Sequence, residues 1–193
     1  MATYFKLVLA DMTIPFAKAK QPSLMMQIGY SEMVARLEKQ LSRVTDLIPN
    51  TFTTAVVVVT PFDVKPSVSP DDALVLIEPF PERSHLSKAG RQQAVNNNQQ
   101  LGACDFGPPE VTAVVFLNRC VTGAGRAEQV THAIIHELAH AKSDLNEEMH
   151  DQNPKGILAK GGATPGRLFL DSDVKWLSKH LGNKREFRMS HFG

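Results

Sequence analysis

The sequence predicts a single α+β domain spanning residues 1–193, in which helices pack on a mainly strand-built sheet. Its 193 residues suffice for one hydrophobic core, and it contains no internal repeat or domain boundary. Short apolar runs typical of strands alternate with segments of helical period. Hydrophobic residues make up 42% and charged residues 21%, which is the composition of an ordinary globular protein.

The first part of the chain predicts a strand, a helix and a second strand. Residues 4–9 alternate loosely and predict the first strand. Ser31 is the expected N-cap of an amphipathic helix covering residues 33–48, whose apolar positions recur every three or four residues. Residues 53–60 contain four consecutive valines, so we expect a strand that is buried on both faces.

The middle of the chain predicts two more strands with a weaker segment between them. Residues 73–78 form a second core strand, and residues 87–102 are expected to be partly helical, with the Asn/Gln run 96–100 at the surface. Residues 111–117 form a third strong strand. If it lies at an exposed edge of the sheet, this strand can pair with an extended peptide. The alternative is an ordinary internal strand.

A helix expected over residues 127–142 carries the motif His136-Glu137-Leu138-Ala139-His140. Residues four apart lie on one face of a helix, so both imidazoles converge on one point. Neutral imidazole is a preferred Zn²⁺ ligand, and Glu137 is placed to act as general base on a water beside the metal. The helix is mostly apolar and therefore buried, which makes its ionisable groups costly unless they are paired or bind a metal.

Beyond this helix, the residues leave the third zinc ligand open. Asp144 would lie about 12 Å along the axis from His136 on a continuing helix, too far for a shared metal. The chain must therefore turn back after His140. The near candidates are Glu147, Glu148, His150 and Asp151, and an acid from the last helix is a remote one.

The C-terminal part predicts a final helix after a segment rich in turn formers. Residues 151–166 contain several Gly, Pro and Asn residues and are expected to be a loop. Residues 171–173 cap a helix over 174–181, with Trp176 and Leu177 on its buried side.

The segment 127–181 resembles the metzincin clan of zinc peptidases, particularly its matrixin-like members. His136, Glu137 and His140 match the core motif, and residues 150–158 resemble the third histidine and the approach to a methionine-containing turn. The resemblance implies a zincin-like fold in which His136, His140 and His150 bind Zn²⁺. Three features depart from the pattern: Ser143 stands at the glycine position, His150 comes four residues late, and Leu158 replaces methionine.

The function that this resemblance implies is a zinc-dependent endopeptidase acting on a protein or peptide substrate. Zinc would polarise the scissile carbonyl and acidify water, and Glu137 would carry the proton to the leaving amine. One alternative is a gluzincin-like peptidase with Glu147 or Glu148 as third ligand. The other is a non-catalytic zincin-like binding protein. Residue type alone makes Tyr30 a candidate for assisting at the oxyanion, and His132 is expected to be a surface or capping histidine.

Charge and cysteine content restrict the partners and the compartment. A net charge of +1 does not favour nucleic acid or an anionic membrane, and no apolar run approaches the ~20 residues of a membrane helix. The N-terminus does not resemble a secretory signal, so we expect secretion by a specialised route, as an effector or toxin-like domain, with a cytoplasmic protein as the alternative. Cys104 and Cys120 could form one disulfide or remain free thiols.

Overall fold

The computed structural model describes residues 3–14, 28–69, 71–106, 111–123, 125–143, 146–164 and 166–181. These residues form one five-stranded mixed sheet with helices, and its strand order is β2-β1-β3-β5-β4. The strands are β1 (Thr3–Asp11), β2 (Thr51–Val59), β3 (Ala73–Glu78), β4 (Gly102–Asp105) and β5 (Thr112–Phe116). β2, β1, β3 and β5 run parallel, whereas β4 is antiparallel to β5. The α+β class expected from the sequence is confirmed.

The centre of the sheet is β3, which pairs with β1 on one side and β5 on the other. All six residues of β3 are buried, because both faces of the sheet are covered at this position. Strands of this kind have continuous apolar sequences instead of alternating ones. The predicted strand at residues 73–78 is therefore confirmed with the same bounds.

The valine-rich strand β2 is an edge strand, so the expectation that it is buried on both faces is wrong. Among its nine residues only Ala55 is buried. Phe52 is 54% exposed and Val59 is 50% exposed. The composition correctly indicates a strand. Its burial, however, depends on its position in the sheet, and β2 lies at the end of the strand order.

The sheet topology also decides which strand lies at the edge of the sheet. β5, predicted at residues 111–117, lies between β3 and β4 and is an internal strand with every residue buried. The terminal strand is β4, which the sequence placed at the end of a partly helical segment. The helical part of that segment is confirmed as α2 (Lys88–Asn96), and the run at residues 96–99 is exposed.

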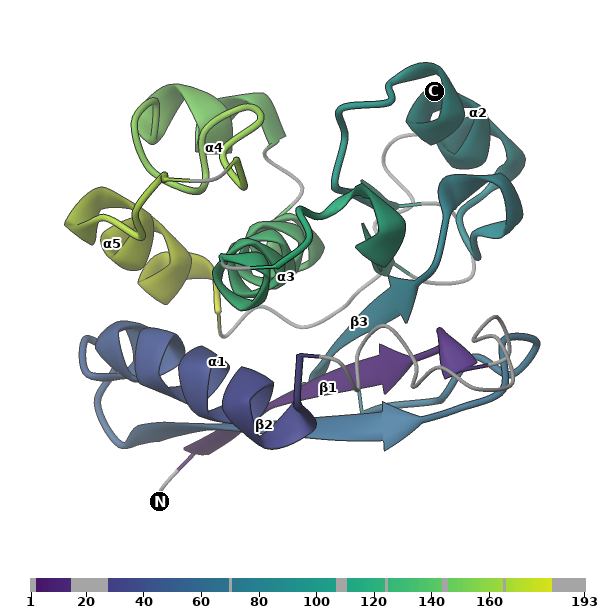
Figure 1. Ribbon diagram of the computed structural model, residues 1–193. Helices are drawn as coiled ribbons and strands as arrows, with labels where there is room; N and C mark the ends of the chain where they lie inside the picture. The colour runs from purple at the N-terminus through teal and green to yellow at the C-terminus, as the bar shows by residue number, and fades with distance from the viewer. Residues whose placement is uncertain are drawn as a thin grey trace, which may run out of the picture.

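The helices lie mainly on one side of the sheet (Figure 1). They are α1 (Tyr30–Thr45), α2, α3 (Arg126–Lys142), α4 (Asn146–Gln152) and α5 (Asp171–His180). A single large core joins the sheet face formed by residues such as Leu9 and Val75 to buried residues of α1, α3 and α5. α3 lies centrally in this layer and contacts β3, β4, β5, α1 and α5.

The start of α1 differs from the prediction. The helix begins at Tyr30 after Gly29, which has φ 87° and provides no side-chain cap, so Ser31 is not the N-cap. Tyr30 instead donates its hydroxyl hydrogen bond to the carboxylate of Asp11 at the end of β1. This bond connects the first turn of α1 to the sheet.

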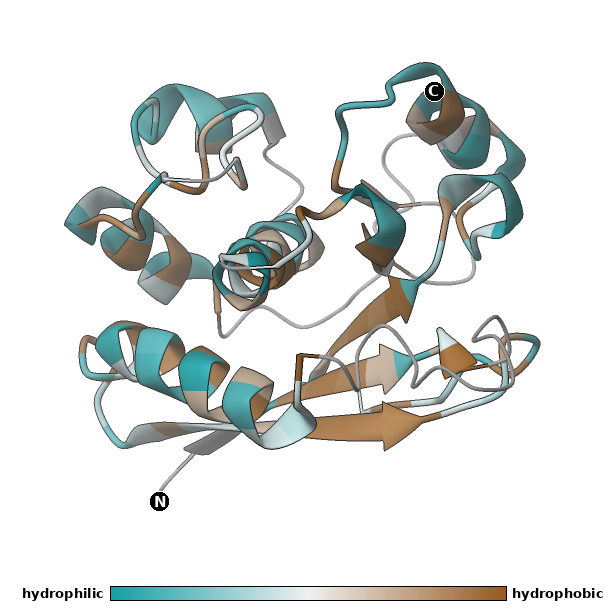
Figure 2. Ribbon diagram, viewed as in Figure 1, coloured by the Kyte–Doolittle hydropathy of each residue, from teal (hydrophilic) through white to brown (hydrophobic). Residues whose placement is uncertain are grey.

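The opposite face of the sheet holds a second, smaller apolar cluster. Its sheet residues include Leu74, Leu76 and Phe116, and they are covered in part by Leu86 and Ala94. In Figure 2 the strands are largely hydrophobic, whereas the outward sides of the helices are hydrophilic. Apolar residues on both faces explain why the central strands lack alternation. No helix in the described part of the chain is long and apolar enough to cross a membrane.

Candidate metal centre

The motif helix α3 is buried along almost its whole length. It begins after Gly125, whose φ of 88° lies in the left-handed region that favours glycine. Thirteen of its seventeen residues are buried, including His132, His136 and Glu137. The prediction of a buried helix is confirmed, whereas His132 is 3% exposed and is therefore not the surface histidine expected from the sequence. Burial lowers the pKa of His132.

The chain leaves the helical path directly after α3, as the spacing of the candidate ligands requires. Ser143 has an extended conformation, with φ −141° and ψ 138°. His150 then lies on the short helix α4, where the sequence had suggested a loop. Asp144, considered and rejected as a ligand, lies outside the described residues.

Three imidazoles come together where α3 and α4 meet. The ring centroids of His136 and His140 are 4.7 Å apart, those of His140 and His150 are 5.2 Å apart, and those of His136 and His150 are 5.4 Å apart. Their candidate ligand atoms all lie within 4.8 Å of one another. Among the described residues, these three histidines form a group of side chains that could hold a metal ion.

Backbone carbonyls determine which ring nitrogen of two histidines is available. Nδ1 of His136 lies 2.7 Å from the carbonyl oxygen of Ile157, and Nδ1 of His150 lies 2.7 Å from that of Leu158. A carbonyl can only accept, so each Nδ1 must carry the hydrogen and donate it. Nε2 of each neutral ring therefore presents a lone pair, which is the arrangement that metal-binding histidines use.

These residues fit a zinc ion by chemistry and by spacing. Burial, together with the nearby His150, lowers the pKa of His136 to about 4, so its ring is neutral near pH 7. Nε2 of His136 and Nε2 of His140 are 3.1 Å apart. Tetrahedral zinc with Zn–N bonds near 2.0–2.1 Å separates its nitrogen ligands by about 3.4 Å, which is close to this distance.

Asp173, an acid of the last helix, contributes to the site without belonging to the three-histidine cluster. Its carboxylate accepts hydrogen bonds from the backbone N–H groups of Ile157 at 3.0 Å and Leu158 at 3.4 Å. It also accepts from the N–H of Leu170 at 2.9 Å and so caps α5. Ile157 and Leu158 therefore bind Asp173 through their N–H groups and hold His136 and His150 through their carbonyl oxygens. Asp173 therefore orients two candidate ligands through the backbone.

The loop can approach Asp173 closely because residue 156 is glycine. A Cβ at Gly156 would lie only 1.9 Å from Oδ2 of Asp173. Asp173 itself is fully buried, and burial raises the pKa of its carboxyl group against the lowering effect of its backbone hydrogen bonds. The signals in the sequence were Gly156 and an acidic residue at the third position of a helix, but neither indicated that the two would meet.

Glu137 lies beside the three histidines with its carboxylate incompletely paired. The residue is 5% exposed, and Oε2 is buried without a hydrogen-bond partner. Burial raises the pKa of this carboxyl group well above its usual range. A buried carboxyl oxygen without a partner costs free energy, and carboxyl groups with strongly perturbed pKa values are found often at functional sites.

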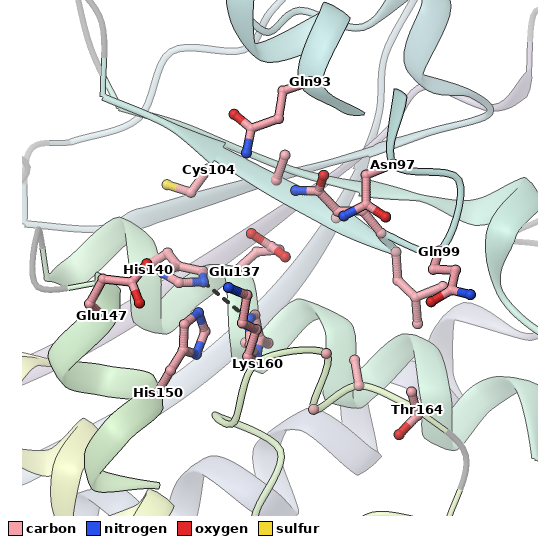
Figure 3. Close-up of a pocket in the computed structure, with 18 residues that line it drawn as sticks. Gln93, Asn97, Gln99, Cys104, Glu137, His140, Glu147, His150, Lys160 and Thr164 are labelled. Atoms are coloured by element: carbon pink, nitrogen blue, oxygen red, sulfur yellow. Dashed lines mark hydrogen bonds between the residues drawn. The ribbon is translucent and has the colours of Figure 1, made fainter. Parts of the chain in front are cut away.

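Glu137 and the three histidines open into one cleft of about 490 Å³ (Figure 3). One wall comes from α2, the following segment and β4, including Gln93, Asn97 and Cys104. The opposite wall is residues 160–164. β4 is the terminal strand of the described sheet, so the edge strand at this cleft is β4 and not β5.

The other candidate ligands and assisting residues occupy different positions. Glu147 lines the cleft but does not belong to the three-histidine cluster. Glu148 is exposed and accepts a hydrogen bond from Gln152 at 2.7 Å, and Asp151 is exposed. Tyr30 is bonded to Asp11 and, like His132, is not among the described residues that line the cleft.

Cys104 and Cys120 are not joined by a disulfide, so the bridge considered as one option does not form. Cys104 is partly exposed on β4, whereas Cys120 is buried. Burial raises the pKa of the Cys120 thiol to about 12. The two cysteines therefore differ in their expected reactivity.

The chain matches no protein-family model, and no curated protein has significant sequence similarity to it. The assignment of a function therefore depends on the chemistry of the site.

Proposed function

We propose that this protein is a zinc-dependent endopeptidase with a metzincin-like, zincin-type active site. The observation that supports this best is the meeting of His136, His140 and His150 beside the carboxylate of Glu137 in one cleft. The three imidazoles provide nitrogen ligands and leave a fourth position for water or substrate. Glu137 is next to a ligand in sequence without belonging to the ligand cluster, as a general base requires.

The protein's own groups have separate roles in this proposal. His136, His140 and His150 would hold the ion, and the carbonyls of Ile157 and Leu158 keep two of the rings in the required tautomer. Zinc held there supplies Lewis acidity, which polarises a carbonyl and acidifies water. Glu137 accepts the proton of the attacking water and delivers it to the leaving amine nitrogen.

The edge strand β4 supports a peptide as the substrate. Gly102, Ala103 and Cys104 line the cleft, and no other described strand pairs with their outer side. An extended chain can bind such an edge through main-chain hydrogen bonds, which require no particular side chain. A substrate bound in this way would pass alongside Glu137 and the histidines.

Two alternatives make different demands on the same residues. In a gluzincin-like site, Glu147 would replace His150, and its position at the cleft keeps this alternative testable. In a non-catalytic zincin-like binding protein, Glu137 would have no role in turnover. Its unpartnered buried oxygen favours the catalytic alternative, because a structural metal site needs no base.

Metal analysis combined with peptide hydrolysis tests the proposal. The purified protein should bind about one zinc per chain, as expected for a mononuclear site. It should hydrolyse casein, lose this activity with a chelator and regain it when zinc is added. Glu137→Ala should retain zinc and the fold while losing roughly 10²–10⁴-fold in rate.

The opposite results separate the alternatives. Hydrolysis that is unaffected by chelation, or near-normal turnover of Glu137→Ala, would show that the mechanism is wrong. Zinc binding without hydrolysis of any protein substrate would favour the non-catalytic alternative.

A further inference from the structure

One wall of the cleft is made of amide side chains and is not used by the proposed mechanism. Gln93 lies on α2, and Asn97, Gln99 and Gln100 lie in the segment between α2 and β4. We call these four residues the amide wall. In Figure 3 the labelled side chains of Gln93, Asn97 and Gln99 lie across the cleft from His140 and His150.

The backbone of the amide wall is held in place from outside the cleft. Nη1 of Arg119 donates to the carbonyl oxygens of Asn97 at 2.8 Å and Gln100 at 2.9 Å. The N–H of Phe116 in β5 donates to the carbonyl oxygen of Leu101 at 2.8 Å. At the other end of α2, the N–H of Ser87 donates to the carboxylate of Asp105 in β4 at 2.6 Å. The wall is therefore positioned before a ligand binds, which reduces the entropy that binding must overcome.

The side chains of the amide wall are available for hydrogen bonding. Within the described residues none of the four makes a side-chain hydrogen bond, and Oε1 of Gln100 is buried without a partner. On the same helix, by contrast, Gln92 donates to Asn96 at 3.0 Å and neither residue lines the cleft. Oε1 of Gln100 therefore has no donor within the described residues, which is costly for a buried acceptor.

The rest of the cleft offers little surface for a large apolar side chain. The apolar side chains lining it are Leu101, Ala103 and Ala163, and no described lining residue is Phe, Tyr or Trp. Amides are uncharged and combine donors with an acceptor, so their best partners are side chains of the same kind. A site built for such hydrogen bonds rejects an apolar analogue, because the analogue leaves a buried polar group unpaired.

We propose that the amide wall selects peptides with an uncharged hydrogen-bonding side chain, Gln, Asn, Ser or Thr, close to the cleaved bond. This inference rests on the proposed peptidase function and adds a substrate class to it. Gln100 is its central residue, since it is the least exposed of the four and its side-chain acceptor is unpaired. Gln93, Asn97 and Gln99 form the more exposed part of the wall.

The first test is digestion of a randomised peptide library by the zinc-loaded protein, followed by sequencing of the products. Gln, Asn, Ser and Thr should be enriched near the cut over Leu and Phe. For matched peptides differing only by Gln against Met, we expect about a ten-fold ratio in kcat/KM, as for one unpaired buried polar group. Gln100→Met should reduce this ratio towards one, mainly by raising the KM of the Gln peptide. The matched control, Gln92→Met, should leave the ratio as it is.

The second test measures binding without turnover. The same Gln and Met peptides are titrated calorimetrically into zinc-loaded Glu137→Gln protein, with and without Gln100→Met. If the Gln peptide binds more tightly than the Met peptide, and Gln100→Met removes this difference, the inference is supported. This holds even if no peptide is cleaved, because in that case only the peptidase proposal fails. The inference about the amide wall fails if cleavage shows no side-chain preference or if both peptides bind equally. It also fails if Gln92→Met changes the kcat/KM ratio as much as Gln100→Met does. None of these outcomes affects the peptidase proposal.

Discussion

Gly102 on β4 and Glu137 on α3 are in such close contact that no side chain fits between them. A Cβ at Gly102 would lie 2.6 Å from both Cγ and Oε1 of Glu137. It would also lie 2.6 Å from the carbonyl oxygen of Val114 on the neighbouring strand β5. Glycine at residue 102 therefore determines where the proposed general base can lie relative to the edge strand.

Gly102→Ala should lower hydrolysis by displacing the Glu137 carboxylate. A displacement of about 1 Å at a reacting group can cost on the order of 100-fold in rate. We expect the loss in kcat, measured by steady-state kinetics, with zinc content preserved because Gly102 does not belong to the three-histidine cluster. A variant with unchanged kcat would show that Glu137 tolerates the added methyl group.

His150→Ala should lower zinc affinity by at least about 100-fold, since loss of a direct ligand exceeds the 10–100-fold effect typical of residues that only orient ligands. Competition with a zinc-binding dye measures the affinity. Glu147→Ala is the matched control, because Glu147 lies on the same short helix and lines the same cleft. Release of zinc by Glu147→Ala, with His150→Ala still binding the metal, would favour the gluzincin-like site instead.

Asp173→Asn should lower zinc affinity by about 10–100-fold although Asp173 is not a ligand. The amide presents a donor and a weaker acceptor to the N–H groups of Ile157 and Leu158, so the loop loses its fixed position. Asp171→Asn is the control, because Asp171 is exposed on the same helix and pairs with Arg43 at 2.9 Å. Equal zinc affinities in the two variants, with only thermal stability changed in Asp173→Asn, would restrict Asp173 to a capping role.

Trp176→Ala should destabilise the fold by about 3–5 kcal/mol, as expected for truncation of a large core aromatic residue. Trp176 is 4% exposed and stacks on His180 at a centroid distance of 4.2 Å. Urea unfolding followed by circular dichroism measures the change in the free energy of unfolding. Lys175→Ala, an exposed neighbour, should change it by less than about 0.5 kcal/mol. A loss below about 1 kcal/mol for Trp176→Ala would contradict the core assignment.

Thiol labelling at pH 8 should modify Cys104 in the folded protein and both cysteines after unfolding. With a pKa of about 12, Cys120 is thiolate in only roughly one molecule in 10⁴ at this pH, and it is also buried. The difference in labelling is measured by mass spectrometry of the intact chain. Cys104→Ser should remain unlabelled until denaturant is added, whereas rapid labelling of that variant would show that Cys120 is accessible.

Local patterns determined several features of this protein from the sequence alone. The apolar run at 73–78 predicted a core strand with its observed bounds, and the apolar residues at 127–142 predicted a buried helix. The spacing of His136 and His140 places both rings on one face, because four residues make about one helical turn. These features depend on residues that are close in sequence, so composition and period are sufficient.

Tertiary structure decided the features that depend on residues far apart in the chain. The valines of β2 do not reveal that the strand has only one neighbour, and the four residues of β4 are too few and too mixed to predict a strand at the cleft. His150 was a candidate ligand among several until α4 brought its ring to the other two. Asp173 became part of the site only because α5 packs where its carboxylate meets the N–H of Ile157, sixteen residues away. A hydrogen bond or a packing contact between distant segments leaves no period in the sequence, because its geometry exists only after the sheet and helices have come together.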